Sequence, residues 1–224
     1  MGLNKNKIFF FDGIKSRIVY LSDNVGMTMT LDNVAEEVIR SAGEIYDFLL
    51  FLAKAKRCNI SLVCAGQSPA YFALAILNLK IYRPEIVEVV VLPYSKKGAV
   101  GNINKECDLY KLRLDEAGVK LRGFVILFDY ILSGVGIISL KKTLEICFPD
   151  SLIGLISINQ TGCTHSVPVY KQFTTSCMSF LLYRQERIVQ QYMPSSFLEE
   201  RMNTGFINLE TDMLAKIVLE KMSQ

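Results

Sequence analysis

The chain has 224 residues, of which half are hydrophobic and 21% are charged, with a formal net charge of +3. This balance is typical of a folded globular protein and excludes a disordered chain, and the charge alone is too small to indicate nucleic acid or an anionic membrane. No stretch approaches the roughly 18 apolar residues of a membrane span, and the run 8–11 is too short for a signal peptide. We expect a soluble, cytoplasmic protein without a membrane partner.

The first 32 residues contain two short strand candidates, 8–11 and 17–21, joined by the turn dipeptide Asp12-Gly13. A helix is predicted over 33–56, with Asp32 or Asn33 as its N-cap. The prediction depends on apolar residues that fall on one helical face, namely Val34, Val38, Ile45, Phe48, Leu49 and Leu52.

Buried strands and helices then alternate. The predicted strands are 59–65, 85–92, 124–128 and 152–158, and the predicted helices are 69–80, 105–117 and 136–147. Strands rich in Val, Ile and Leu that alternate with helices are typical of a parallel sheet. We therefore predict an α/β fold with a mainly parallel central sheet and helices on both faces.

The alternation stops after Asn159. A strand over 167–173 and helices over 179–191 and 209–222 are expected in this tail. We predict one domain over 1–224, with a core of about 33–158 and extensions at 1–32 and 159–224, the latter a helical hood over the sheet. The amphipathic last helix would dock on its own domain, in a homodimer or on a partner protein.

Six cysteines and one histidine limit the chemistry. The cysteines form no CxxC pair and are predicted to be reduced and mostly buried. His165 lies in an expected polar turn, so neither a zinc cluster nor a Ser–His nucleophile is favoured. We predict no metal site built from protein side chains alone.

A strand, an acid, a glycine turn and a helix follow one another between residues 124 and 147. The apolar run ends at Asp129, and the turn Ser133-Gly134-Val135-Gly136 precedes the helix. Backbone N–H groups at such a helix start bind phosphate.

Two other loops follow predicted strands. Gly66-Gln67-Ser68 comes after the strand 59–65, and the segment 93–104, with Lys96 and Lys97, has no apolar periodicity and is predicted to be mobile. Because the carboxyl ends of parallel strands share one edge, we expect all three loops around one ligand site.

Over residues 33–158 this arrangement resembles the type I phosphoribosyltransferases. Their motif is four apolar residues, two acids, two apolar residues and a hydroxyl- and glycine-rich turn. The matching positions are 125–128 for the apolar run, Asp129 for the first acid, 131–132 for the apolar pair and 133–136 for the turn.

The resemblance implies a role for each loop. Asp129 would hold the ribose hydroxyls, with Tyr130 beside it, and Ser133, Gly134, Val135 and Gly136 would hold the 5′-phosphate. Gly66, Gln67 and Ser68 would bind pyrophosphate, and Lys96 or Lys97 would neutralise it as it leaves. The implied ligands are phosphoribosyl pyrophosphate or a nucleotide, with Mg²⁺ as cofactor.

The chain departs from the family motif in two places. Tyr130 replaces the second acid, and Val135 and Ile137 stand where hydroxyl residues are frequent. Each missing hydroxyl would remove about 1–2 kcal/mol of phosphate binding. Transfer of phosphoribose to a base therefore competes with a second interpretation, a catalytically inactive binding or regulatory protein.

A third interpretation is a sugar-phosphate isomerase-type binding domain, since Gly66 to Ser68 resembles that family's phosphate loop. A dinucleotide-binding protein is disfavoured because no GxGxxG follows the first strand.

Overall fold

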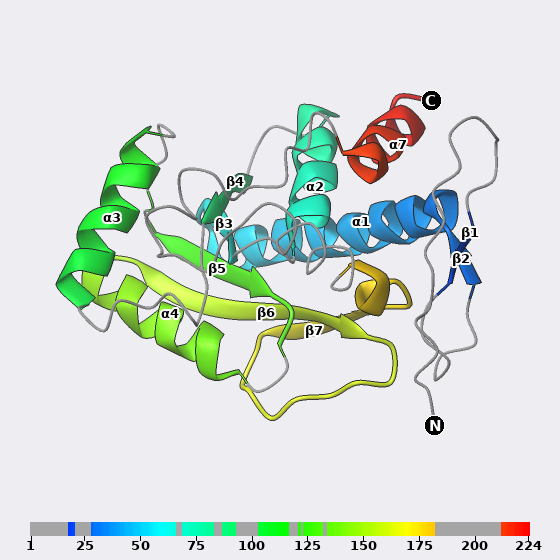
Figure 1. Ribbon diagram of the computed structural model, residues 1–224. Helices are drawn as coiled ribbons and strands as arrows, with labels where there is room; N and C mark the ends of the chain where they lie inside the picture. The colour runs from blue at the N-terminus through cyan, green and yellow to red at the C-terminus, as the bar shows by residue number, and fades with distance from the viewer. Residues whose placement is uncertain are drawn as a thin grey trace, which may run out of the picture.

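A computed structural model of the chain describes residues 18–20, 28–65, 69–82, 87–92, 103–116, 121, 123–131, 134–181 and 212–224. At its centre is a five-stranded sheet with the strand order β4-β3-β5-β6-β7 (Figure 1). Every neighbouring pair in it is parallel. The strands are β3 (Ile60–Ala65), β4 (Val87–Leu92), β5 (Phe124–Asp129), β6 (Leu152–Gln160) and β7 (Lys171–Thr175).

Helices cover both faces of this sheet. One face packs against α1 (Leu31–Lys56) and α2 (Ala70–Tyr82), and α7 (Met213–Met222) packs on these two helices. The other packs against α3 (Ile103–Glu116) and α4 (Val135–Cys147). The predicted fold class, a mainly parallel sheet with helices on both faces and a C-terminal helix, is confirmed. None of the helices in the described part of the chain is long and apolar enough to cross a bilayer.

The N-terminal elements differ from the sequence prediction in detail. A short antiparallel pair, β1 (Ile18–Tyr20) and β2 (Thr28–Thr30), precedes α1, and β2 was not predicted. Thr30, rather than Asp32 or Asn33, caps α1: its hydroxyl accepts a hydrogen bond of 3.1 Å from the backbone N–H of Asn33. The β-branched threonine has the extended backbone of an N-cap, which places the helix start two residues earlier. The strand predicted at 8–11 lies outside the described residues.

The C-terminal elements begin later than predicted. β7 starts at Lys171, so most of the strand expected at 167–173 belongs instead to the β6–β7 connection, residues 161–170. α7 starts at Met213 rather than at 209, because the Asp212 side chain caps it by accepting from the N–H of Ala215. Residues 178–181 are helical, and the rest of the helix predicted at 179–191 lies outside the described residues.

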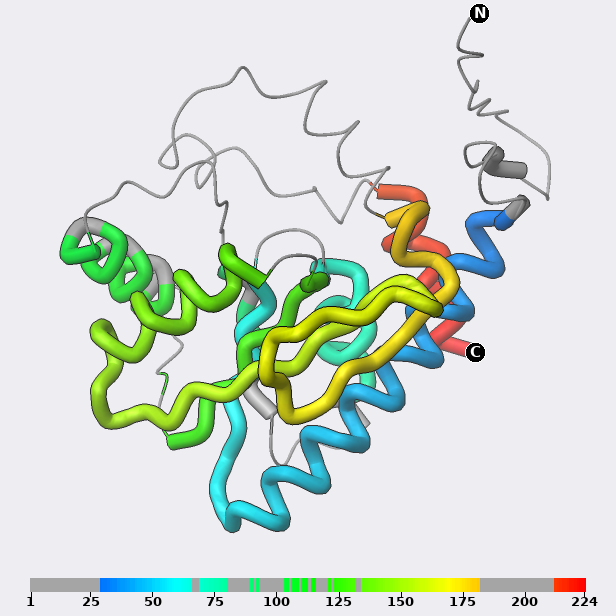
Figure 2. Tube along the Cα trace, turned by 90° about the horizontal axis from the view of Figure 1, so that it is seen from below, coloured from blue at the N-terminus to red at the C-terminus, as the bar shows by residue number. Residues whose placement is uncertain are grey.

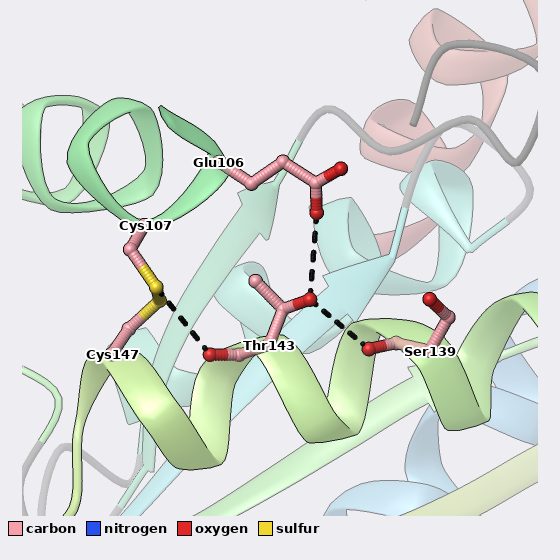
Figure 3. The surroundings of a disulfide bond; sticks show 5 residues. All are labelled: Glu106, Cys107, Ser139, Thr143 and Cys147. Carbon is pink, nitrogen blue, oxygen red and sulfur yellow. Dashed lines mark hydrogen bonds between the residues drawn. A yellow bond between two sulfur atoms is a disulfide. The ribbon is translucent and has the colours of Figure 1, made fainter. Parts of the chain in front are cut away.

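A disulfide joins α3 to α4 (Figure 3). Cys107 and Cys147 are both buried, and their Cα atoms are 5.2 Å apart. The prediction that all cysteines are reduced is therefore wrong for this pair. Forty residues separate the two cysteines along the chain, and only the packing of α3 on α4 brings them together. Beside them, the hydroxyl of Thr143 donates to the carboxylate of Glu106 at 3.4 Å.

Removing this disulfide should destabilise the protein. We expect the double variant Cys107→Ser/Cys147→Ser to lose about 3–4 kcal/mol of unfolding free energy, because the unfolded chain regains the freedom of a long closed loop. Urea unfolding with and without dithiothreitol measures the loss. The reduced wild type should approach the double variant, and Cys58→Ser, at a free and partly buried thiol, should keep the full response to reductant. Equal stability of oxidised and reduced wild type would contradict the prediction.

Candidate functional site

The carboxyl ends of β3 and β5 form the topological switch point of the sheet. α2, which follows β3, packs on the same face as α1, whereas α4, which follows β5, packs on the opposite face. Ligands of open α/β sheets bind at the carboxyl ends of two neighbouring strands whose following helices lie on opposite faces of the sheet. Cys64 pairs with Phe128 in the parallel register, so the strand ends at Ala65 and Asp129 are neighbours at this switch point.

Asp129 is the ionisable side chain at the end of β5. It is partly buried, and its Oδ1 accepts a hydrogen bond of 2.7 Å from the backbone N–H of Tyr130. Burial raises the pKa of the Asp129 carboxyl to about 8, although the bond from Tyr130 acts in the opposite direction. Without a ligand, the group is therefore mostly a neutral carboxylic acid near neutral pH.

Tyr130 lies beside Asp129 but packs against the apolar core on the α1 face. Burial raises the pKa of its phenol, and the nearby Cys163 thiol adds to this effect. The phenol therefore stays protonated and can donate a hydrogen bond. Packing against the core is enough to explain the position of Tyr130, so its contact with a ligand stays a prediction.

α4 begins at a glycine, which has no side chain to cap the helix. Gly134 is the N-cap residue, with a positive φ of 73°, and it makes no side-chain capping bond. The helical ladder begins with the bond of 3.0 Å from the N–H of Ile138 to the carbonyl of Gly134. No acidic residue lies in the first turn of α4, so no carboxylate of that turn offsets the positive end of the helix dipole. Val135 is 54% exposed at this end.

The β6–β7 connection lies against this turn. It is on the same side of the sheet as α4 (Figures 1 and 2), and its Val167 is buried among residues of α4 and β5. A Cβ atom placed on Gly134 would overlap the Cγ2 of Val167. Only a glycine therefore allows both the left-handed backbone and this close approach.

The sequence analysis gave no site role to three polar residues that belong to β6 or the connection after it, namely Ser157, Asn159 and His165. Ser157 of β6 is the register partner of Asp129, and the Ser157 hydroxyl is 2.8 Å from Nε2 of His165. The amide Nδ2 of Asn159 donates to the carbonyl of Ile131 at 2.6 Å. Ser157 and Asn159 are two residues apart and so share a face of β6. The available signal was the appearance of polar residues at alternate positions near the end of an apolar strand.

Several predicted site residues lie outside the described residues, and their roles remain predictions. They are Gly66, Gln67, Ser68, Lys96, Lys97 and Ser133. The structure brings Asp129, Tyr130, Gly134, Val135 and Gly136 to one edge of the sheet, directly after β5. Within the described ranges, no group of three or more His, Cys, Asp or Glu side chains could hold a metal ion.

No protein-family profile and no curated protein matches the chain. Solved structures with a similar course of the chain include a hypoxanthine phosphoribosyltransferase from Staphylococcus aureus (12% identity, TM-score 0.40), covering 62% of this chain and 73% of that one. The HGPRT-ase from Leishmania tarentolae in complex with GMP has 14% identity and a TM-score of 0.40, covering 65% of this chain and 79% of that one. The Trypanosoma cruzi hypoxanthine phosphoribosyltransferase has 12% identity and a TM-score of 0.41, with coverage of 62% and 76%. These values give no ground for transferring an activity or a residue role.

Substituting Gly134 should test the close packing of the turn. Gly134→Ala combines an unfavourable φ with an overlap on Val167, and we expect it to cost at least about 2 kcal/mol of unfolding free energy. Gly162→Ala is the matched control, because Gly162 also has a positive φ but faces open space. It should cost only about 1 kcal/mol. Chemical denaturation measures both, and equal costs would contradict the packing argument. Val167→Ala should recover part of the loss in the Gly134→Ala background but not in the Gly162→Ala background.

The stability contribution of Asp129 should depend on pH. Because its pKa is about 8 in the folded protein and near 4 in an unfolded chain, the folded state binds more protons between these values. Stability is therefore lost as the pH rises from about 4 to about 8. Asp129→Asn removes this loss, so its advantage over wild type in thermal unfolding should grow with pH across that interval. A constant difference between the two proteins from about pH 5 to about pH 8 would show that the carboxyl is not buried as described.

Proposed function

We propose that the carboxyl edge of the sheet binds a phosphorylated ribose, as phosphoribosyl pyrophosphate or as a nucleotide. The observation that carries the proposal is that the carboxyl group of Asp129 and the N-terminus of α4 follow each other at the switch point. A carboxyl group binds sugar hydroxyls, and helix N–H groups bind phosphate. One ribose 5-phosphate offers both chemical groups to adjacent parts of the site.

The remaining parts of the ligand are assigned by sequence. In this proposal residues 66–68 follow β3 and take the pyrophosphate, and Lys96 and Lys97 follow β4 and neutralise it. A leaving pyrophosphate would need such basic residues to neutralise its charge.

Magnesium fits this site as a partner of the ligand. Asp129 has no cationic partner among the described residues, and its raised pKa reflects a carboxyl that lacks a stabilising charge. Mg²⁺ is commonly held by one or two carboxylates together with substrate phosphates, so a single carboxylate suffices. When bound, the ion would supply positive charge between the ribose hydroxyls and the pyrophosphate. Asp129 is the described residue that would contact it.

Binding without catalysis is the second candidate function, and a specific observation favours it. Tyr130 occupies the position of the family's second acid and packs against the core, so this motif would offer a ribose one acid, Asp129. A transferase forms a bond from a base nitrogen to C1 of the ribose as the C1–oxygen bond to pyrophosphate breaks. With a single acid to stabilise the positive charge at C1, this step would be slow.

Thermal-shift titration with phosphoribosyl pyrophosphate and Mg²⁺ tests the binding proposal. Wild type should be stabilised, and Asp129→Asn should bind about tenfold more weakly, since a charge-assisted contact is lost. Asp150→Asn is the control, because Asp150 is exposed in the turn before β6, at the opposite end of that strand. An unshifted wild type at millimolar ligand would rule out the proposal. If binding is found, pyrophosphate release in the presence of a panel of nucleobases separates a transferase from a binding protein.

A further inference from the structure

Asn159 connects β6 to the segment that follows Asp129. Its side chain is only 1% exposed, and its Nδ2 donates to the carbonyl of Ile131 at 2.6 Å. The two residues are 28 positions apart in the chain. Since a peptide group is planar, a bond to this carbonyl restrains the orientation of the peptide plane that carries it, directly after Ile131.

The same side chain is an unfavourable choice for stability alone. Its Oδ1 is buried and has no hydrogen-bond partner. The amide orientation follows from the contact itself, because a carbonyl oxygen facing Ile131 O would be repelled. A buried acceptor without a partner costs free energy that an apolar residue of similar size, such as leucine, would avoid. Residues that break such local rules are expected at functional sites.

The turn is held at its other end as well. Val167 of the β6–β7 connection packs against Gly134, closely enough to exclude a Cβ. The connection is in turn fixed to the sheet by the bond between Ser157 and His165, and by the bond of 2.8 Å from Gln172 to the carbonyl of Cys163. Two residues between Asp129 and α4, namely Ile131 and Gly134, are therefore each held by a contact from β6 or its connection.

We propose that Asn159 is a positioning residue for the phosphate-binding turn. Its amide holds the Ile131 carbonyl so that the N–H groups at the start of α4 and the carboxyl group of Asp129 keep a fixed relative placement. Asn159 acts through the backbone and does not contact the ligand. The expected effect of Asn159 on ligand binding rests on the proposed function. Its restraint on the Ile131 carbonyl does not require a ligand.

Three measurements on Asn159→Leu test the proposal. Hydrogen exchange of the ligand-free protein reports on peptides covering 130–137, with β3 as internal reference. Titration with ribose 5-phosphate reports on the site, and thermal unfolding reports on stability. Asn78→Leu is the matched control, because the amide of Asn78 also donates to a backbone carbonyl, that of Leu74 at 3.0 Å, within α2. Asn159→Ser, whose hydroxyl ends short of Ile131 O, serves if the leucine variant does not fold.

The proposal predicts that binding weakens while stability stays nearly unchanged. Asn159→Leu should exchange about tenfold faster over 130–137 and bind ribose 5-phosphate about tenfold more weakly, with an unfolding midpoint within about 3 °C of wild type. Asn78→Leu should leave exchange over 130–137 and binding unchanged. Faster exchange throughout the sheet with a lower midpoint would indicate a merely structural residue and overturn the proposal, as would wild-type exchange over 130–137. If wild type does not bind ribose 5-phosphate, the proposed function fails, while a local rise in exchange still supports the positioning role.

Discussion

The parallel register of β3, β5 and β6 is the constraint on which the candidate site depends. β5 is the central strand, and its residues from Phe124 to Phe128 are all buried between the two helical layers. A charged group cannot be placed within such a strand without a large desolvation cost. The first position where the chain can carry an acid is where β5 leaves the layers, at Asp129. The register then places this acid beside the end of β3 and beside Ser157 of β6.

Three features at this edge are individually unfavourable in the ligand-free protein. Asp129 is a carboxyl whose ionised form is disfavoured by burial, the N-cap residue of α4 is a glycine with no side chain to cap the helix, and Asn159 has an unpaired oxygen. Each would be a small cost if it stood alone in the fold. A ligand with hydroxyl and phosphate groups would relieve the first two directly. The third maintains the backbone that joins them, which gives the three features one common explanation.

The sequence predicted those parts of the fold that local patterns determine. The apolar run of β5, its terminal acid and the glycine before α4 identified the strand, the turn and the helix to within one residue. It did not predict contacts between distant segments, such as the Cys107–Cys147 disulfide, because neither cysteine has a distinctive local pattern. Asn159 and Val167 were missed for the same reason. Asn159 directly follows the strand predicted at 152–158, where a polar residue is typical of a loop, and only the pairing of β6 with β5 brings it to Ile131.

The shape of the β6–β7 connection explains why these missed residues cluster. Parallel neighbours usually need a helical crossover, but β7 pairs only with the last five residues of β6, Ile156 to Gln160. The chain therefore has to return only about 16 Å, which ten residues can cover without a helix. This connection crosses on the α4 face and fills the space beside the start of α4, where Val167 packs. Because β7 is short, the connection can pass beside the turn before α4 and pack against it. The geometry of the candidate phosphate site therefore depends on β6 and β7 as well as on β5.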